Sequence, residues 1–192
     1  KKLNNKKYNK PNITINKVYT KVGDKGFTYI VGGYKVKKNS LRINVFGDID
    51  HLNVLIGSCC VSANNLSRVK TDSWTKLFKL LLNIQQDLFN LGNMIATLSS
   101  DFSKNMPQIN KNSIKIIENN IDLYNENLPT LKSFVLPGGN ELSIKFHEAR
   151  TFCRYVERMV VDLDDCEEVD KIILSYLNRL SDLLFVLARW SN

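Results

Sequence analysis

The side chains with the clearest chemical potential are three arginines and a glutamate in the C-terminal half of the chain. Arg150, Arg154, Glu157 and Arg158 lie at positions i, i+4, i+7 and i+8, so in a helix they share one face. Guanidinium groups that converge in this way can bind one anion, such as a phosphate. A solvated face in which Glu157 balances its neighbours is the simpler interpretation of these residues alone.

A second candidate for anion binding is the stretch TKVGDKGFT, residues 20–28, which two glycines and a cluster of lysines follow at 32, 33, 35, 37 and 38. Glycines allow backbone N–H groups to approach a ligand closely, and hydroxyls and lysines add donors and positive charge. A polyphosphate needs this combination. The Walker pattern is absent, because no Gly-Lys-Ser/Thr precedes a helix, and a glycine-rich hairpin without a ligand remains the alternative.

A third candidate is Asn178 in YLNRLSDLLF, residues 176–185. An uncharged amide beside Leu177 and Leu180 is either at the edge of an apolar face or a dedicated hydrogen-bonding group, and the residues leave both open. Arg179 and Asp182 are three residues apart and predict a local ion pair.

These candidates need a scaffold, and the apolar pattern predicts an all-α, five-helix antiparallel bundle. Apolar residues alternate at spacings of three and four in each predicted helix. In the first, Asp48 is the expected N-cap, Asp50 lies in the first turn, and the apolar face runs from Ile49 to about Ser62. The other four seams run from Trp74 to Leu98, from Ile114 to Leu128, from Leu142 to Leu163, and from Ile173 to Leu187.

The region before the bundle reads as a glycine- and lysine-rich segment, mostly loop with limited strand. Short β-type pieces surround Ile13, Tyr29 and Val45. The predicted organisation is therefore a basic, disordered tail over residues 1–16 and one helical domain over 17–192. Within that domain, residues 17–47 form the N-terminal segment and residues 48–190 form the bundle.

Composition narrows the class of protein. The chain has 192 residues with 43% hydrophobic content, which suits one domain with a sizeable core. Its net charge is +8, but five of these charges are lysines in residues 1–10, which contain no acid. The folded part is thus only mildly basic, and a nucleic-acid partner is not expected.

Cysteine usage and hydropathy exclude further classes. The four cysteines form no Cys-x-x-Cys pair and the chain has two histidines, so neither a zinc site nor a secreted disulfide framework is expected. No apolar run approaches the roughly 20 residues that a membrane-spanning helix needs, so no membrane partner is expected.

Five sequence blocks in this order and spacing carry a family resemblance. They are TKVGDKG, LRINVFGDIDHLN, FVLPGGNEL, HEARTFCRYVER and YLNRLSDLLFVLAR. Together they resemble the ATP:cob(I)alamin adenosyltransferases of the PduO type, over roughly residues 17 to 190. The resemblance implies an enzyme that transfers the 5′-deoxyadenosyl group of ATP to cobalt(I) of cobalamin, giving adenosylcobalamin and triphosphate. It also implies a homotrimer with active sites between neighbouring subunits.

The resemblance assigns roles to individual residues. It implies that Arg150 pairs with Asp50 for corrinoid binding and catalysis, and that Phe134 lies under the corrin and displaces its lower axial ligand. It implies ATP-binding roles for residues of the N-terminal segment, which makes residues 17–47 a nucleotide-binding segment, and for residues of two helices. These residues are Thr20, Lys21, Val22, Gly23, Thr28, Tyr29, Lys38, Arg154, Tyr155, Val156, Glu157, Arg158 and Asn178. Mg²⁺ is expected with ATP, without an assigned protein ligand.

Three positions depart from the family pattern. Val22 stands where the family usually has Thr or Asn, His51 where it has Glu, and Tyr155 where a second consecutive arginine is common. Val22 still offers a backbone N–H, whereas Tyr155 removes a charge near the phosphates. Weaker affinity for ATP is the expected consequence.

The implied partners are ATP, a reduced corrinoid, a corrinoid reductase and an adenosylcobalamin-dependent mutase. The implied location is mitochondrial in a eukaryote and cytoplasmic otherwise. Two other functions remain as alternatives: a helical bundle that carries or senses ATP or corrinoid without turnover, and a basic nucleic-acid-binding bundle. The latter lacks aromatic residues interleaved on a basic face.

Overall fold

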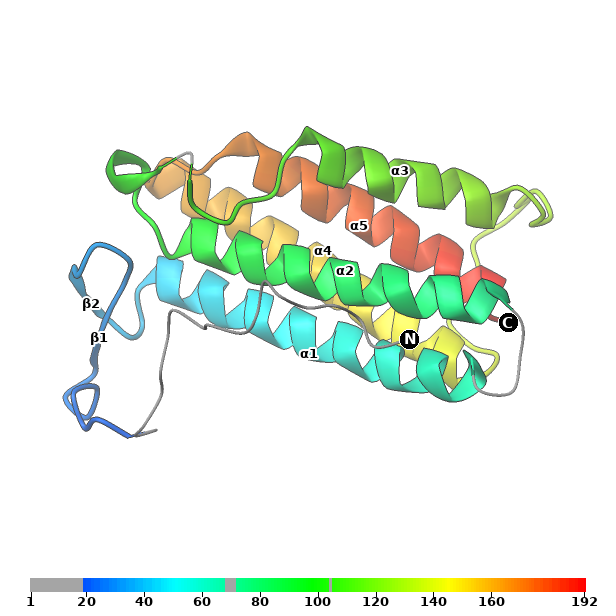
Figure 1. Ribbon diagram of the computed structural model, residues 1–192, viewed down its shortest axis with the longest axis horizontal. Helices are drawn as coiled ribbons and strands as arrows, with labels where there is room; N and C mark the ends of the chain where they lie inside the picture. Colours follow the sequence, from blue (N-terminus) through cyan, green and yellow to red (C-terminus); the bar gives the residue numbers. More distant parts are fainter. Residues whose placement is uncertain (1–18, 68–71, 104) are drawn as a thin grey trace, which may run out of the picture.

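The computed structural model describes residues 19–67, 72–103 and 105–192; the predicted tail over residues 1–16 lies outside these ranges. Five α-helices account for most of this part and confirm the predicted all-α bundle (Figure 1). They are α1 (Leu41–Ser67), α2 (Asp72–Ile95), α3 (Lys111–Asn125), α4 (Glu141–Cys166) and α5 (Lys171–Trp190). A 3₁₀ turn, η1 (Ser99–Asp101), lies between α2 and α3.

The helices pack in a fixed order. Helix α1 contacts α2 and α4, α4 contacts α5, and α3 packs on the outer side of α5 (Figure 1). Helices α1 and α4 run antiparallel, because Lys145 near the start of α4 donates a hydrogen bond to Ser62 near the end of α1, while Arg42 at the start of α1 pairs with Glu167 just after α4. This arrangement places the start of α1 beside the end of α4.

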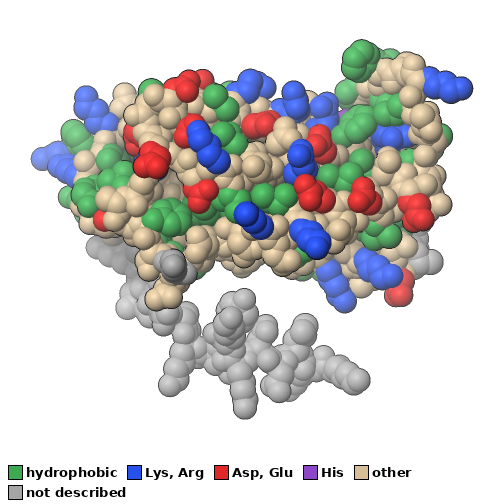
Figure 2. Space-filling model, turned by 90° about the horizontal axis from the view of Figure 1, so that it is seen from above, with side chains coloured by type: hydrophobic (Ala, Val, Ile, Leu, Met, Phe, Trp, Pro, Cys, Tyr) green, Lys and Arg blue, Asp and Glu red, His purple; other side chains and the backbone are tan. Residues whose placement is uncertain are grey.

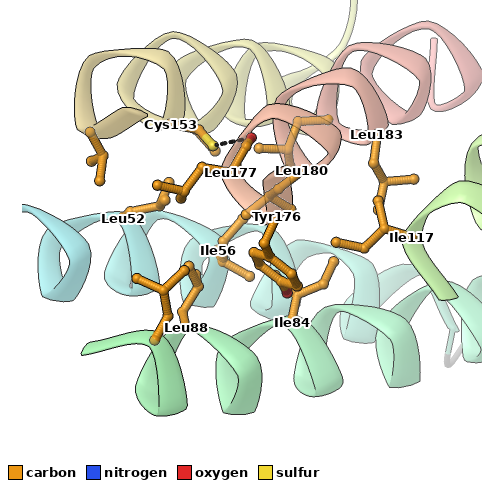
Figure 3. Packing of buried hydrophobic residues seen from close by; sticks show 14 of the residues in the cluster. Leu52, Ile56, Ile84, Leu88, Ile117, Cys153, Tyr176, Leu177, Leu180 and Leu183 are labelled. Atoms are coloured by element: carbon orange, nitrogen blue, oxygen red, sulfur yellow. Dashed lines mark hydrogen bonds between the residues drawn. The ribbon is translucent and has the colours of Figure 1, made fainter. Parts of the chain in front are cut away.

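The predicted apolar seams meet in one core (Figure 3). Tyr176 is fully buried in this core, and its hydroxyl donates a hydrogen bond to Asp87 at 3.1 Å, which gives the buried oxygen a partner. The core residues labelled in Figure 3 come from all five helices: Leu52, Ile56, Ile84, Leu88, Ile117, Cys153, Tyr176, Leu177, Leu180 and Leu183.

All four cysteines are free thiols. Cys59, Cys60 and Cys153 are buried and Cys166 is exposed. The thiol of Cys153 donates to the carbonyl oxygen of Leu177 at 3.3 Å, so it links α4 to α5 inside the core. Burial raises the pKa of Cys59 to about 12 and that of Cys60 to about 11, and it also raises the pKa of Cys153.

The predicted start of the first helix is wrong. Helix α1 begins at Leu41 rather than after Asp48, and the predicted β-type piece around Val45 is helical; the helix also continues past Ser62 to Ser67. Arg42 and Val45 are buried, and they extend the buried face of Ile49 towards the N-terminus. Burial of this face outweighs the local β preference of the sequence. Asp48 is therefore no N-cap, and Asp50 does not open a helix.

The segment before the bundle is a small hairpin. Strands β1 (Phe27–Tyr29) and β2 (Lys35–Lys37) pair antiparallel, which confirms limited strand within a glycine-rich loop. The N–H of Val31 donates to the carbonyl of Ala96 at 2.9 Å, so the hairpin is fastened to the end of α2. The nucleotide-binding segment inferred from the sequence thus contacts the bundle where α2 ends.

Arg42 fastens three elements at this end of the bundle. The residue is 5% exposed; its Nε donates to Glu167 at 2.7 Å and its Nη1 donates to the carbonyl of Ile95 at 2.6 Å. The carbonyl belongs to the last turn of α2, where backbone oxygens lack helical partners, so a cation there is favourable. The buried guanidinium therefore joins α1, α2 and the α4–α5 connection.

Replacing Arg42 with leucine is expected to lower the free energy of unfolding by about 2 kcal/mol, because charged hydrogen bonds are lost and carbonyls are left unpaired. Glu167→Gln is the matched control, since Glu167 is partly exposed and its loss should cost under about 1 kcal/mol. Urea unfolding of both variants measures the difference. Equal losses would show that the carbonyl contacts contribute little.

Acidic and basic side chains are interspersed on the face of the molecule in Figure 2. A protein that binds along a nucleic-acid backbone usually presents a continuous basic stripe. On this face acidic side chains interrupt the basic ones. In the described ranges, no helix is long and apolar enough to span a membrane.

Candidate functional site

Backbone hydrogen bonds within the hairpin close a compact loop around Gly23. The N–H of Asp24 donates to Lys21, the N–H of Gly26 donates to Gly23, and the N–H of Lys38 donates to Gly26 at 2.9 Å. Lys21 has a φ of 60°, the left-handed conformation that alternates with right-handed residues in anion-binding loops. The turn between β2 and α1 is therefore tied directly to the glycine-rich loop.

Lys38 lies against Gly23, so the structure brings two of the predicted ATP-binding residues together. A Cβ added at Gly23 would lie 2.8 Å from the Lys38 Nζ, so a side chain there would displace the ammonium group. Thr28 lies in β1 opposite Val36 of β2. An exposed ammonium beside an open backbone turn can bind a phosphate oxygen.

The other predicted ATP-binding residues of the segment lie on the surface of the hairpin. Thr20, Lys21 and Val22 are exposed in the turn before β1, and Tyr29 is exposed at the end of β1. Their side chains are therefore open to a ligand that binds over this loop.

The predicted arginine face of α4 is present and open to solvent. Arg154, Tyr155 and Arg158 are exposed; Arg158 donates to the Arg154 carbonyl at 3.1 Å, and its Cζ lies 5.8 Å from the centroid of the Tyr155 ring. Val156 differs from these residues because it is fully buried in the core. Its side chain cannot contact a nucleotide on this face.

Asn178 is a hydrogen-bonding group, which resolves the two alternatives left open by the sequence. Its Nδ2 donates to Glu157 at 3.0 Å, and its Oδ1 accepts from Arg179 at 2.6 Å. The predicted Arg179–Asp182 ion pair is also formed, at 3.6 Å. The hydrogen bond from Asn178 of α5 therefore fixes Glu157, which lies on the arginine face of α4.

Two of the departures from the family pattern lie in one row of rings between α1 and α4. The centroids of His51 and Phe152 are 4.3 Å apart, and those of Phe152 and Tyr155 are 5.5 Å apart. Aromatic pairs at such separations attract each other beyond simple burial. The two departures are therefore coupled in space through Phe152, a link that sequence reasoning missed.

Arg150 lines a cavity of about 510 Å³ and is the one arginine that the described residues contribute to its lining. Its Cζ lies 6.0 Å from the centroid of the Phe185 ring, and its buried Nε has no hydrogen-bond partner in the described part of the chain. Phe134 lies at the same cavity and is fully exposed, so it is no core plug. The cavity lining comprises Leu131, Ser133, Phe134, Val135, His147, Arg150 and Phe185.

His147 is a residue of this cavity that sequence reasoning overlooked. It is 5% exposed, its ring lies 6.3 Å from Phe185, and no described group hydrogen-bonds to its Nδ1. Burial lowers the pKa of His147, and the positive charge of Arg150 lowers it further. The available signal was its position one helical turn before Arg150.

The lowered pKa of His147 predicts an acid sensitivity of folding. Below pH 6.5, the ordinary pKa of histidine, the unfolded chain takes up a proton that the folded chain resists. The free energy of unfolding should therefore decrease as the pH is lowered. The loss cannot exceed about 1.4 kcal/mol per pH unit. Urea unfolding at about pH 7.5 and about pH 5.5 should show a smaller loss for His147→Gln than for the unaltered chain. Identical losses would contradict the assignment.

Asp50 and Arg150 do not meet within the chain. Asp50 is exposed and lines a separate cavity of about 260 Å³ between α1 and α2, whose walls include Phe46 and Phe89. No ion pair joins Asp50 to Arg150 in the described ranges. The pairing stays a prediction that one chain alone does not fulfil.

The hairpin and the Arg150 cavity occupy different places along the bundle axis. Lys38 precedes Arg42 by four residues, and Arg42 pairs with Glu167, so the hairpin ends at the Glu167 end of the bundle. Glu167 follows Arg150 by 17 residues (167 − 150) along α4 and its C-cap, which at a rise of 1.5 Å per residue is about 25 Å. A single chain therefore contains both the hairpin and the Arg150 cavity, but it does not bring them together around one ligand.

Two further observations concern metal-binding groups and the cavity at the α4–α5 connection. Within the described ranges, no three His, Cys, Asp or Glu side chains form a group able to bind a metal ion. A cavity of about 760 Å³ lies at the acidic α4–α5 connection near Arg42 and contains none of the predicted site residues. The chemistry predicted from the sequence therefore centres on the hairpin, the arginine face and the Arg150 cavity.

Fold and site together define a class: a five-helix bundle with a glycine-rich hairpin at one end and a separate, mainly apolar cavity that Arg150 lines. Comparison with known proteins identifies a family that matches this chain. The family model described as cobalamin adenosyltransferase matches residues 18–191. The chain belongs to this family.

Individual relatives support the assignment. A corrinoid adenosyltransferase of Bacillus subtilis is 39% identical over 92% of this chain and 86% of its own length. A cobalamin adenosyltransferase of Cupriavidus metallidurans is 39% identical over 93% of this chain and 89% of its own. The structure of a variant PduO-type ATP:corrinoid adenosyltransferase from Lactobacillus reuteri, complexed with cobalamin and ATP, has a TM-score of 0.81 at 35% identity and covers 92% of this chain and 93% of that one.

Proposed function

We propose that this chain transfers the 5′-deoxyadenosyl group of ATP to cobalt(I) of cobalamin. Cobalt(I) supplies the electron pair for the new cobalt–carbon bond, the bond between C5′ and its oxygen breaks, and triphosphate leaves with the electrons of that bond. Because cobalt is the nucleophile, the protein needs no nucleophilic side chain of its own. Its tasks are to position the carbon, stabilise the leaving group and exclude water.

The observation that carries this proposal is the Arg150 cavity with the exposed ring of Phe134 at its edge. A solvent-exposed phenylalanine beside a cavity of about 510 Å³ is suited to contact a large flat ligand. In the proposed complex Phe134 lies under the corrin and displaces its lower axial ligand without binding cobalt itself. Arg150 provides the positive charge at the same cavity.

The hairpin and the arginine face are proposed to hold ATP. The open turn at Gly23 with Lys38 supplies backbone and ammonium donors for the phosphates, and Arg154 and Arg158 add guanidinium donors. Mg²⁺ would reach the site on the phosphates of ATP, as is usual for nucleotide-bound magnesium. Tyr155 carries no charge, so affinity for ATP is expected to be modest.

The separation of these parts supports a site shared between subunits of a homotrimer. In this arrangement Asp50 of one copy reaches Arg150 of the next, and the hairpin of one copy faces the cavity of another. The exposed apolar side chains of Phe46 and Phe89 beside Asp50 suit a subunit contact. Sedimentation should give about three times the chain mass of 22.0 kDa; a fully active monomer would refute the shared site.

Cellular partners follow from the reaction. A corrinoid reductase would deliver cobalt in its lowest oxidation state, and an adenosylcobalamin-dependent mutase would receive the product. The proposed location is mitochondrial in a eukaryote and cytoplasmic otherwise.

The decisive experiment incubates the protein with ATP, Mg²⁺ and chemically reduced cobalamin and follows adenosylcobalamin by absorbance, with triphosphate release as a second measurement. Product that depends on both ATP and protein supports the proposal. Saturable binding of both ligands without product would instead indicate a carrier or sensor. Competition by oligonucleotides at moderate salt would indicate a nucleic-acid-binding protein.

A further inference from the structure

His147 lies where two cavities meet. It lines the Arg150 cavity and also a neighbouring cavity of about 240 Å³, whose wall includes Ser143 and Arg189. The two cavities also share Leu131 and Val135, so apolar side chains lie beside the imidazole in both. A buried polar ring between two cavities is suited to contact a ligand that enters either of them.

The surroundings of the ring determine which nitrogen carries the proton. Nδ1 is shut off from solvent and has no hydrogen-bond partner in the described part of the chain. A buried N–H without an acceptor is rarer and costlier than an unpaired acceptor. The neutral ring therefore has no proton on Nδ1 and carries its proton on Nε2, the other ring nitrogen of a side chain that lines both cavities. The lowered pKa of His147 agrees with a neutral ring.

We propose that His147 is a positioning residue of the corrinoid site, whose Nε2–H donates a hydrogen bond to the carbonyl oxygen of a peripheral carboxamide of the corrin. This inference rests on the proposed function and extends it to a residue with no assigned role. Arg150 lies one helical turn further along α4 and lines the same cavity. The two side chains would hold one edge of the macrocycle against the ring of Phe134.

The chemistry favours a carboxamide over other acceptors. Corrin rings carry acetamide and propionamide side chains around their edge, so neutral carbonyl oxygens are their commonest acceptors. A neutral donor beside the apolar side chains of Leu131 and Val135 suits a neutral acceptor, because a single hydrogen bond is stronger where water is excluded. Phosphate oxygens are better matched by the cationic hairpin, which carries Lys38 and an open backbone turn.

Two isosteric variants test the donor position. Glutamine places its amide nitrogen near the position of Nε2, whereas asparagine places its amide nitrogen near that of Nδ1. His147→Gln should keep the KM for cobalamin within about threefold, and His147→Asn and His147→Phe should raise it about tenfold, the value of one neutral hydrogen bond. The KM for ATP and the value of kcat should change little in all three. Titration of cob(II)alamin by absorbance in the presence of ATP should show the same order of affinities.

Each other outcome overturns the inference. Equal KM values for the glutamine and asparagine variants would show that no donor at Nε2 acts on the corrinoid. An effect on the KM for ATP, or on the oligomeric state, would place the contact with the nucleotide or with a second copy. Urea unfolding identifies a variant that fails to fold, and the remaining pair still decides the question. Lack of adenosylation by the unaltered protein would instead refute the proposed function.

Discussion

Replacing Arg150 with lysine is expected to reduce kcat/KM for the corrinoid about a hundredfold or more. The lysine keeps the charge but loses the planar two-point contact that a guanidinium makes with a carboxylate. In the proposed trimer the pair is buried at a subunit contact, where removing one partner costs about 3 to 5 kcal/mol, and Asp50→Asn should cause a loss of similar size. The measurement is steady-state adenosylcobalamin formation by both single variants and by the double variant.

Strong non-additivity in this double-mutant cycle is the signature of a coupled pair. Because the two residues do not meet within one chain, coupling would also place them across a subunit boundary. Asp182→Asn is the matched control: Asp182 is an exposed carboxylate paired with Arg179, and its loss should cost under about 1 kcal/mol. Independent, additive losses at Asp50 and Arg150 would rule out the pair.

Phe134→Ala is expected to leave the fold and ATP affinity intact and to reduce turnover from cob(II)alamin at least about tenfold, a barrier increase of about 1.4 kcal/mol. The side chain is fully exposed, so the free energy of unfolding should change by less than about 0.5 kcal/mol. Turnover from fully reduced cob(I)alamin should fall less, because displacement of the lower ligand matters most for the reduction step.

Leu136→Ala provides the control on the same loop, since Leu136 is also largely exposed and has no proposed contact with cobalt. It should retain near-normal turnover from both substrates. Equal losses from cob(II)alamin and cob(I)alamin in Phe134→Ala would mean that the ring acts in binding alone.

The bundle was predictable because its helices carry unbroken apolar seams. The seam of α4 runs through Phe146, Ala149 and Cys153, all fully buried, with Arg150 and Arg154 beside it as the spacing predicts. A three-four repeat over many residues has few alternative structures, so the helical register follows from the sequence.

The start of α1 was not predictable by the same means. The residues that bury its first turns include Arg42, whose partners Ile95 and Glu167 are distant in sequence. The hydrophobic pattern of residues 41–47 does not reveal contacts with residues so distant in sequence. The β-branched residues nearby favoured a strand instead.

The candidate site also combines residues that the sequence identifies with contacts that only the packing of the helices shows. Asn178 lay on a predicted helix, yet its partner Glu157 became evident only from the packing of α4 against α5. His147 was overlooked because a lone histidine on an apolar face has no periodic signature. Asp50 and Arg150 could be named from the resemblance, but a single chain does not supply the second copy that their meeting requires.

The unequal exposure of the four cysteines makes selective chemical labelling of one thiol possible. Three thiols are enclosed in the core, and their raised pKa values keep them protonated and unreactive at neutral pH. Cys166 is exposed at the end of α4, next to the α4–α5 connection. A maleimide dye or spin label should therefore attach there without any cysteine being removed, and distances between labels would report the geometry of an assembled oligomer directly.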